Sequence, residues 1–328
     1  MLNIVDMHCD TIMKIYQSEE NGTPEHLRKN SFQLDREKLT AGEYQLQNFA
    51  LFLDKQEYKD PYNTCKEMVG CFNREMDQNR DWITPVKNFE DILAARADKK
   101  VAALLTMEEG APICGEIEKL EEFYRLGVRM MTLTWNYPNE IGFPNAAFVD
   151  PSSEVLQPLQ MQKGLTEQGI AIVKRMEELG MIIDVSHGSD QLVEDVLAHT
   201  QKPFVASHSN ARAVCPHYRN LPDSLIRKIA DRGGVIGINY FELFLRSPNS
   251  SVSLIEAFRA HVDHLRNVGG IDCVGLGSDF DGIPVSSDLL DAAAVGKLYH
   301  VLHQSGYTSS EVEKIFNGNV LRLYKACL

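Results

Sequence analysis

Histidines and acids of the kinds that bind divalent metal ions follow short apolar stretches at five places in this chain. They are His8 with Asp10, then Glu108 or Glu109, then His187, His208 and Asp279. Residues two apart in a β-strand project to the same side, so His8 and Asp10 would point together while Cys9 points away. Imidazole nitrogens and carboxylate oxygens suit zinc and harder divalent ions. A lone His-x-Asp is most often a hydrogen-bonded core pair, but the recurrence favours a site for two ions that share a carboxylate.

The apolar stretches that precede these residues have the pattern of a parallel sheet. Eight of them, mostly separated by amphipathic helices, cover residues 4–7, 44–53, 101–107, 128–134, 181–185, 204–207, 235–238 and 273–278. Strands that alternate with helices and are apolar on both faces form parallel sheets. Eight such units favour a (β/α)8 TIM-type barrel over an open doubly wound sheet, which is the alternative. No linker divides the chain, so we predict one domain over residues 1–328.

In a barrel of this kind the functional residues gather at the carboxyl ends of the strands. One helix and one strand separate His187 from His208, so we expect these residues on neighbouring strands. Helix starts are marked at Thr166, at Ser253 and at Thr308, the last two with a glutamate three residues later. The segment 54–98 contains no motif that indicates a chemical function. Its charged sequence predicts helices, which Pro61 and Pro85 would interrupt.

Composition and charge limit the classes of partner. The formal net charge of −13 argues against nucleic-acid and anionic-membrane partners, which need a basic surface. The seven cysteines are odd in number and include no C-x-x-C pair, so neither a disulfide scaffold nor a zinc finger is expected. The start of the chain lacks a signal-peptide pattern, and no stretch approaches the ~20 apolar residues of a membrane span. We therefore expect a cytoplasmic enzyme.

Seven motifs together resemble the membrane (renal) dipeptidase family, a dinuclear zinc branch of the amidohydrolase-type barrels. They are Val-Asp-Met-His-Cys-Asp at 5–10, Thr-Met-Glu at 106–108, Gly-Leu-Thr at 164–166, Gly-Met-Ile-Ile-Asp-Val-Ser-His at 180–187, Ser-His-Ser at 207–209, Arg-Asn-Leu-Pro-Asp at 219–223 and Gly-Ser-Asp-Phe-Asp-Gly at 277–282. The resemblance covers nearly the whole chain and is weakest over 54–98. It implies a hydrolase of dipeptides that works with two zinc ions. For partners, we expect a small-molecule substrate and a homodimer.

The resemblance also implies individual roles. His8 and Asp10 would hold one zinc, His187 and His208 the other, and Glu108 would bridge both, with Glu109 as the second choice for the bridge. Zinc lowers the pKa of bound water from about 15.7 to about 7, which provides a nucleophile. Asp279 would take the proton of this nucleophile and return it to the leaving amine. Arg219 would form a two-pronged pair with the terminal carboxylate of the substrate.

The chain departs from the family at one position that concerns activity. Animal members carry a histidine after Thr-Leu-Thr that is thought to stabilise the oxyanion, and this chain has Trp135 and Asn136 there. Loss of one such donor costs ~10²–10³ in rate unless Asn136, Tyr137 or the second metal replaces it. We expect Trp135, Asn136 and Tyr240 to contact the substrate. A long loop follows, with prolines at 138, 144 and 151, and such loops are often lids or pocket walls.

Two alternatives to a zinc dipeptidase remain from the sequence. The same metal architecture could act on another amide, such as an N-acyl amino acid or a lactam, because Trp135 makes the pocket more apolar. The chain could also bind metal without catalysis. The presence of Asp279 beside a full ligand set argues against this second alternative.

Overall fold

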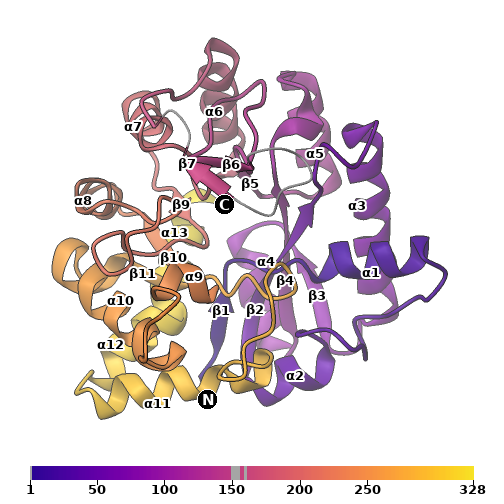
Figure 1. Ribbon diagram of the computed structural model, residues 1–328. Coiled ribbons are helices and arrows are strands. Elements are labelled where there is room, and N and C mark those ends of the chain that lie inside the picture. Colours follow the sequence, from indigo (N-terminus) through magenta and orange to yellow (C-terminus); the bar gives the residue numbers. More distant parts are fainter. Residues whose placement is uncertain (1, 149–155, 159–160) are drawn as a thin grey trace.

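Eight buried strands pair in parallel and close into a barrel that helices surround (Figure 1). The computed structural model describes residues 2–148, 156–158 and 161–328. In order around the barrel, the strands are β1 (Ile4–Asp6), β2 (Tyr44–Phe52), β4 (Val101–Glu108), β5 (Met130–Thr132), β8 (Ile182–Asp184), β9 (Val205–Ala206), β10 (Val235–Ile238) and β11 (Val274–Leu276). β11 pairs with β1, which closes the ring. The predicted (β/α)8 barrel is confirmed, and these strands match the eight apolar stretches.

Most helices follow a strand and cover the barrel from outside (Figure 1), and the last three come after the final strand, β11. They are α1 (Thr11–Glu20), α2 (Arg36–Ala41), α3 (Pro61–Gln78), α4 (Phe89–Ala97), α5 (Ile117–Leu126), α6 (Glu167–Leu179), α7 (Asp190–His199), α8 (Asp223–Asp231), α9 (Glu242–Leu245), α10 (Leu254–Gly269), α11 (Gly296–Gln304), α12 (Ser309–Glu313) and α13 (Asn319–Cys327). Thr308 and Glu311 form the predicted capping box, and Ser253 accepts a hydrogen bond from the Glu256 backbone N–H. Thr166 likewise accepts from the Gly169 N–H at the start of α6.

The prediction for residues 54–98 was wrong in one respect. The structure places a short strand, β3 (Ile83–Val86), between α3 and α4, and Pro85 lies inside it. β3 pairs only with the first half of β4, so its other edge needs no ladder hydrogen bonds and tolerates a proline. Pro61 does not break a helix either; it opens α3 at a position where its missing N–H costs nothing.

The long loop after β5 contains a second, two-stranded antiparallel sheet of β6 (Ala146–Phe148) and β7 (Leu156–Pro158), which the sequence did not reveal. Pro151, which the sequence analysis placed in this loop, lies outside the described residues. In Figure 1 this small sheet lies near β5 and α6, away from α11 and α12.

The interior of the barrel is apolar towards the start of the strands. One buried cluster joins Val5, Leu46 and Leu104 of the strands to Leu323 and Tyr324 of α13. The side chains beyond the strand ends are instead mostly polar, although they are equally buried. Polar groups in such a setting need partners or ligands, because unpaired burial is costly.

Two further features concern the cysteines and the helices. All seven cysteines are free thiols, as their number and spacing predicted. Among the described residues, no helix is both long and apolar enough to cross a bilayer.

Candidate metal centre and active site

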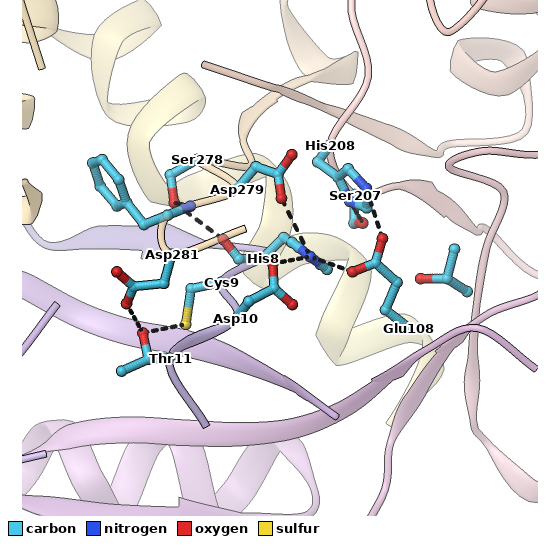
Figure 2. Close-up of polar contacts among 12 residues, drawn as sticks. His8, Cys9, Asp10, Thr11, Glu108, Ser207, His208, Ser278, Asp279 and Asp281 are labelled. Atoms are coloured by element: carbon cyan, nitrogen blue, oxygen red, sulfur yellow. Dashed lines mark hydrogen bonds and ion pairs between the residues drawn. The ribbon is translucent and has the colours of Figure 1, made fainter. Parts of the chain in front are cut away.

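The side chains predicted as metal ligands converge on Glu108, the last residue of β4 (Figure 2). Its Oε2 lies 3.0 Å from His8 Nε2, and its Oε1 lies 3.1 Å from His187 Nε2 and 3.5 Å from His208 Nε2. Asp10 Oδ2 is 3.4 Å from His8 Nε2. The two oxygens of one carboxylate therefore face two different groups of ligand atoms.

The backbone turns sharply where the strands end, and this brings the side chains inward. Glu109, His187 and Asp279 all have left-handed backbone, with φ of +83°, +67° and +64°. Positive φ is uncommon for residues other than glycine and clusters at functional sites. Cys9 points away from the site as predicted, and its Sγ lies 3.3 Å from the Asn48 carbonyl oxygen.

Neighbouring side chains fix the orientation of His208. Ser207 Oγ lies 2.5 Å from Asp184 Oδ2 and 2.8 Å from His208 Nδ1. The carboxylate can only accept, so Ser207 donates to Asp184 and accepts from the Nδ1–H of His208. This leaves a lone pair on His208 Nε2, directed at Glu108, as in metal sites whose ligating histidines are held through the other ring nitrogen.

Several buried polar atoms at this site have no hydrogen-bond partner, and they show whether the site suits a metal ion. Within the described residues, both ring nitrogens of His8 and Oδ1 of Asp10 are such atoms. Glu108 Oε2 lies close to His8 Nε2, but the contact does not have the geometry of a hydrogen bond. A divalent cation satisfies converging nitrogen and oxygen atoms of this kind, so the donor set fits zinc.

The electrostatics of the cluster agree with cation binding. Burial lowers the pKa of His187 and of His208, which keeps both rings neutral and able to act as ligands. Burial also lowers the pKa of His8, but the charges of Glu108 and Asp10 outweigh it and raise this pKa well above its ordinary value. The field around His8 is therefore strongly negative and attracts a cation.

Comparison with known proteins identifies the family. The model of the membrane dipeptidases, peptidase family M19, matches residues 1–327. The chain belongs to this family. A dipeptidase from Schizosaccharomyces pombe, described as uncharacterized, is 30% identical over 93% of this chain and 73% of its own length. A Klebsiella pneumoniae protein, described only as uncharacterized and in the pqqA 5' region, is 40% identical over 72% of this chain and 85% of its own.

Solved structures of the M19 family have the same fold. The dipeptidase AC, a metallopeptidase, is 25% identical with a TM-score of 0.87, and the match covers 99% of this chain and 98% of that one. A metallopeptidase from Rhodobacter sphaeroides is 24% identical with a TM-score of 0.88, covering 99% of both chains. Family and fold together make this protein a metal-dependent hydrolase.

In this M19 member, Asp279 lies beside the first group of ligands. Its Oδ1 is 3.7 Å from His8 Nε2, while its Oδ2 accepts a hydrogen bond of 2.8 Å from Asn239 Nδ2 (Figure 2 shows Asp279 and His8). One oxygen is thus held and the other faces the cluster. His8, Asp10 and Asp279 are also close enough to share one cation, a possibility that the sequence analysis did not consider.

Gly282 makes room for these carboxylates. A Cβ at this position would lie 2.1 Å from Asp10 Oδ2 and 2.8 Å from Asp279 Oδ1. We expect Gly282→Ala to displace the carboxylate of Asp10 and to weaken binding of one metal ion by about 10–100-fold, the range for residues that position ligands. Titration of the metal-free protein with zinc measures this. Gly296→Ala is the control, since its Cβ would meet only Leu2 Cδ1 at 3.9 Å; equal zinc affinity in both variants would contradict the expectation.

Arg219 is buried, whereas a loop arginine is ordinarily exposed. It is 2% exposed, its Nη2 donates to the His208 carbonyl oxygen at 3.3 Å, and its guanidinium lies 5.3 Å from the centre of the Phe244 ring. Burial lowers its pKa to about 10, so it is charged at neutral pH. Its Nε and Nη1 have no hydrogen-bond partner among the described residues. Such a buried cation is suited to an anionic ligand.

Glu109, the second choice for the bridge, is bonded elsewhere. Its Oε1 accepts from Asn139 Nδ2 at 2.6 Å and from the Ala111 N–H at 2.9 Å, and its Oε2 accepts from the Trp135 N–H at 3.2 Å. Both oxygens are therefore directed at the loop after β5. Glu108 is the carboxylate that the structure brings to the histidines.

The three residues expected to contact substrate have different surroundings. Trp135 is partly exposed, and its ring centre lies 4.8 Å from that of Phe52 and 6.3 Å from that of His187, so it forms an aromatic wall beside the site. Tyr240 is 3% exposed and its ring packs between Phe258 and Phe280 in the core, so its contact with substrate stays a prediction.

Asn136 lies beside one of the candidate metal ligands. It is buried, and its Oδ1 lies 3.0 Å from His187 Nδ1. Its amide thus contacts a candidate ligand, and the expected contact with substrate stays a prediction. The sequence analysis also missed Asp184, Ser207 and Asn239 as supports; the first two lie inside the motifs of the family resemblance, which was an available signal.

Proposed function

We propose that this M19 protein is a dinuclear zinc dipeptidase that hydrolyses the peptide bond of dipeptides with a free terminal carboxylate. The observation that supports it most is the position of Glu108, with one oxygen towards His8 and the other towards His187 and His208. In this proposal His8 and Asp10 would hold one ion, His187 and His208 would hold the other, and Glu108 would bridge them. A pair of zinc ions, when bound, supplies a hydroxide at neutral pH and polarises the substrate carbonyl.

The remaining steps belong to the side chains of this protein. Asp279 accepts the proton of the nucleophilic water at Oδ1, because Asn239 already occupies Oδ2. It then delivers this proton to the nitrogen of the leaving amine as the C–N bond breaks. Arg219 binds the terminal carboxylate through its buried guanidinium, whose Nε and Nη1 have no other partner in the described part of the chain, and this fixes the position of the scissile bond.

The substrate class has support from a relative. The Rhodobacter sphaeroides metallopeptidase was solved with a phosphinate mimic of the dipeptide L-Ala-D-Ala. A ligand of this size with one free carboxylate matches the buried guanidinium of Arg219, which lies against the carbonyl oxygen of His208.

A second candidate is hydrolysis of another amide, such as an N-acyl amino acid or a lactam. The wall of Trp135 and Phe52 favours it, since an apolar acyl group packs well against aromatic rings. Metal binding without catalysis is the least supported alternative, because Asp279 keeps one carboxylate oxygen directed at the ligand cluster.

Metal analysis of the purified protein, combined with a substrate screen, tests the proposal. We expect about two zinc ions per chain, loss of activity on chelation and recovery when zinc is restored. The screen compares L,L and L,D dipeptides with N-acyl amino acids. Protein that carries no transition metal and binds none when offered it would remove the nucleophile and overturn the proposal. Faster turnover of N-acyl amino acids than of every dipeptide would support the second candidate instead.

A further inference from the structure

We infer that Asn136 is a positioning residue that sets the tautomer of His187, and that Glu109 holds the loop carrying it, so that this pair controls the affinity for the second metal ion. The inference rests on the proposed function, because it concerns the ion assigned to His187 and His208.

The hydrogen-bond partners of the two histidines lead to this inference. Asn136 Oδ1 is an acceptor, so the His187 Nδ1 at 3.0 Å carries the hydrogen and Nε2 carries a lone pair. His208 has the same tautomer, because Ser207 accepts from its Nδ1. The two Nε2 atoms are 3.0 Å apart, and neither has a hydrogen to donate. With Glu108 Oε1 3.1 Å from His187 Nε2, three acceptor atoms meet where only a cation relieves their repulsion.

The supports of the two histidines differ in origin. His208 is held by Ser207 and Asp184, which belong to the ends of neighbouring barrel strands. His187 is held by Asn136, which belongs to the loop after β5. The orientation of His187 therefore depends on how well that loop is fixed.

Glu109 is the residue that fixes the loop at both ends of its first turn. It is fully buried and accepts from the Trp135 N–H, directly before Asn136, and from the Asn139 side chain, three residues after it. The Asn139 side chain also donates to the Leu133 carbonyl oxygen at 2.8 Å and accepts from the Ile141 N–H at 2.8 Å. Asn136 thus lies in a turn whose backbone has little freedom to move.

Two substitutions of nearly equal size at Asn136 test the inference. Asn136→Leu removes the acceptor, whereas Asn136→Asp keeps one. Metal-free full-length protein is titrated with zinc against a chromophoric chelator, which resolves the two equivalents. We expect Asn136→Leu to bind the second equivalent about 10–100-fold more weakly and the first unchanged, the cost typical of losing a support of a metal-bound histidine. Asn136→Asp should bind both as the wild type does. Ser207→Ala is a positive control, because it removes the corresponding support of His208.

A second measurement reports the tautomer without any metal. NMR of the ¹⁵N-histidine-labelled, metal-free wild type should show His187 protonated at Nδ1; protonation at Nε2 would overturn the inference even if Asn136→Leu did not fold. Equal zinc affinities of Asn136→Leu and wild type would also overturn it. Equal weakening in the Leu and Asp variants would show a packing role and have the same consequence. A wild type that binds fewer than two ions would instead contradict the proposed function, so the two failures are distinguishable.

Discussion

Replacing Asp279 with asparagine should lower kcat by about 10²–10⁴ while the zinc content stays at the wild-type value. The amide has the same shape and its oxygen can still accept from Asn239, so the loop after β11 is undisturbed. The amide nitrogen, however, cannot take a proton from water at neutral pH. The rate loss therefore measures proton transfer, and steady-state kinetics with parallel metal analysis checks it.

Asp281→Asn is the matched control for this experiment. Asp281 is also buried and two residues away, but its oxygens accept from Thr11 Oγ1 and the Gln33 N–H instead of facing the cluster (Figure 2 shows its contact with Thr11). We expect a far smaller change in kcat. Unchanged turnover in Asp279→Asn would remove Asp279 from the mechanism. Loss of one zinc ion would show that Asp279 is a ligand of the first ion.

Arg219→Ala should reduce kcat/KM for dipeptides with a free terminal carboxylate by about 30-fold or more, from the 2–5 kcal/mol that breaking a buried charge pair costs. The guanidinium is buried with two unpaired nitrogens, so nothing else among the described contacts replaces it. Dipeptides amidated at the C-terminus lack the partner charge and should lose little. Arg219→Lys should fall in between, because an ammonium cannot form the two-pronged pair. The ratio of kcat/KM for free and amidated substrates is the measurement.

Arg212→Ala controls for a general effect on this loop. Arg212 lies seven positions earlier, forms a two-pronged pair with Asp190 and should affect both substrate types alike. If Arg219→Ala also lowers the rates for free and amidated dipeptides by the same factor, the carboxylate-binding role is wrong.

Much of the fold could be predicted because each barrel strand is buried on both faces. Such strands are mostly apolar, and eight of them alternating with helices leave few architectures. β3 was not predicted because a proline such as Pro85 indicates a helix break when the pairing of its segment is unknown. Only the pairing of β3 with β4 shows that Pro85 lies at a sheet edge, where proline is tolerated. β6 and β7 are three residues each, too short to show a periodic pattern.

The family resemblance supplied the candidate ligands, and the geometry of their meeting came from the structure. The motif at 106–108 indicated Glu108 as the bridge, and the hydrogen bonds of Glu109 show why Glu109 itself is unsuited to bridging. The sequence could not show that the ring of Tyr240, a predicted substrate contact, packs against Phe258 and Phe280, because both partners are distant in the chain.

Four expectations from the sequence stay predictions. They are one domain over 1–328, a homodimer, a cytoplasmic location and the absence of a nucleic-acid partner.

The sequence by itself determined which residue types stand at the carboxyl ends of the strands, because apolar runs and the polar residues after them are local patterns. Only the tertiary structure decided what each polar atom faces. Asn136 and Arg219 illustrate this, since the partner of one and the burial of the other depend on residues brought together from distant strands and loops. The pattern of apolar residues along a chain predicts which segments are buried, but hydrogen-bond partners are fixed only when the closed barrel brings distant residues together.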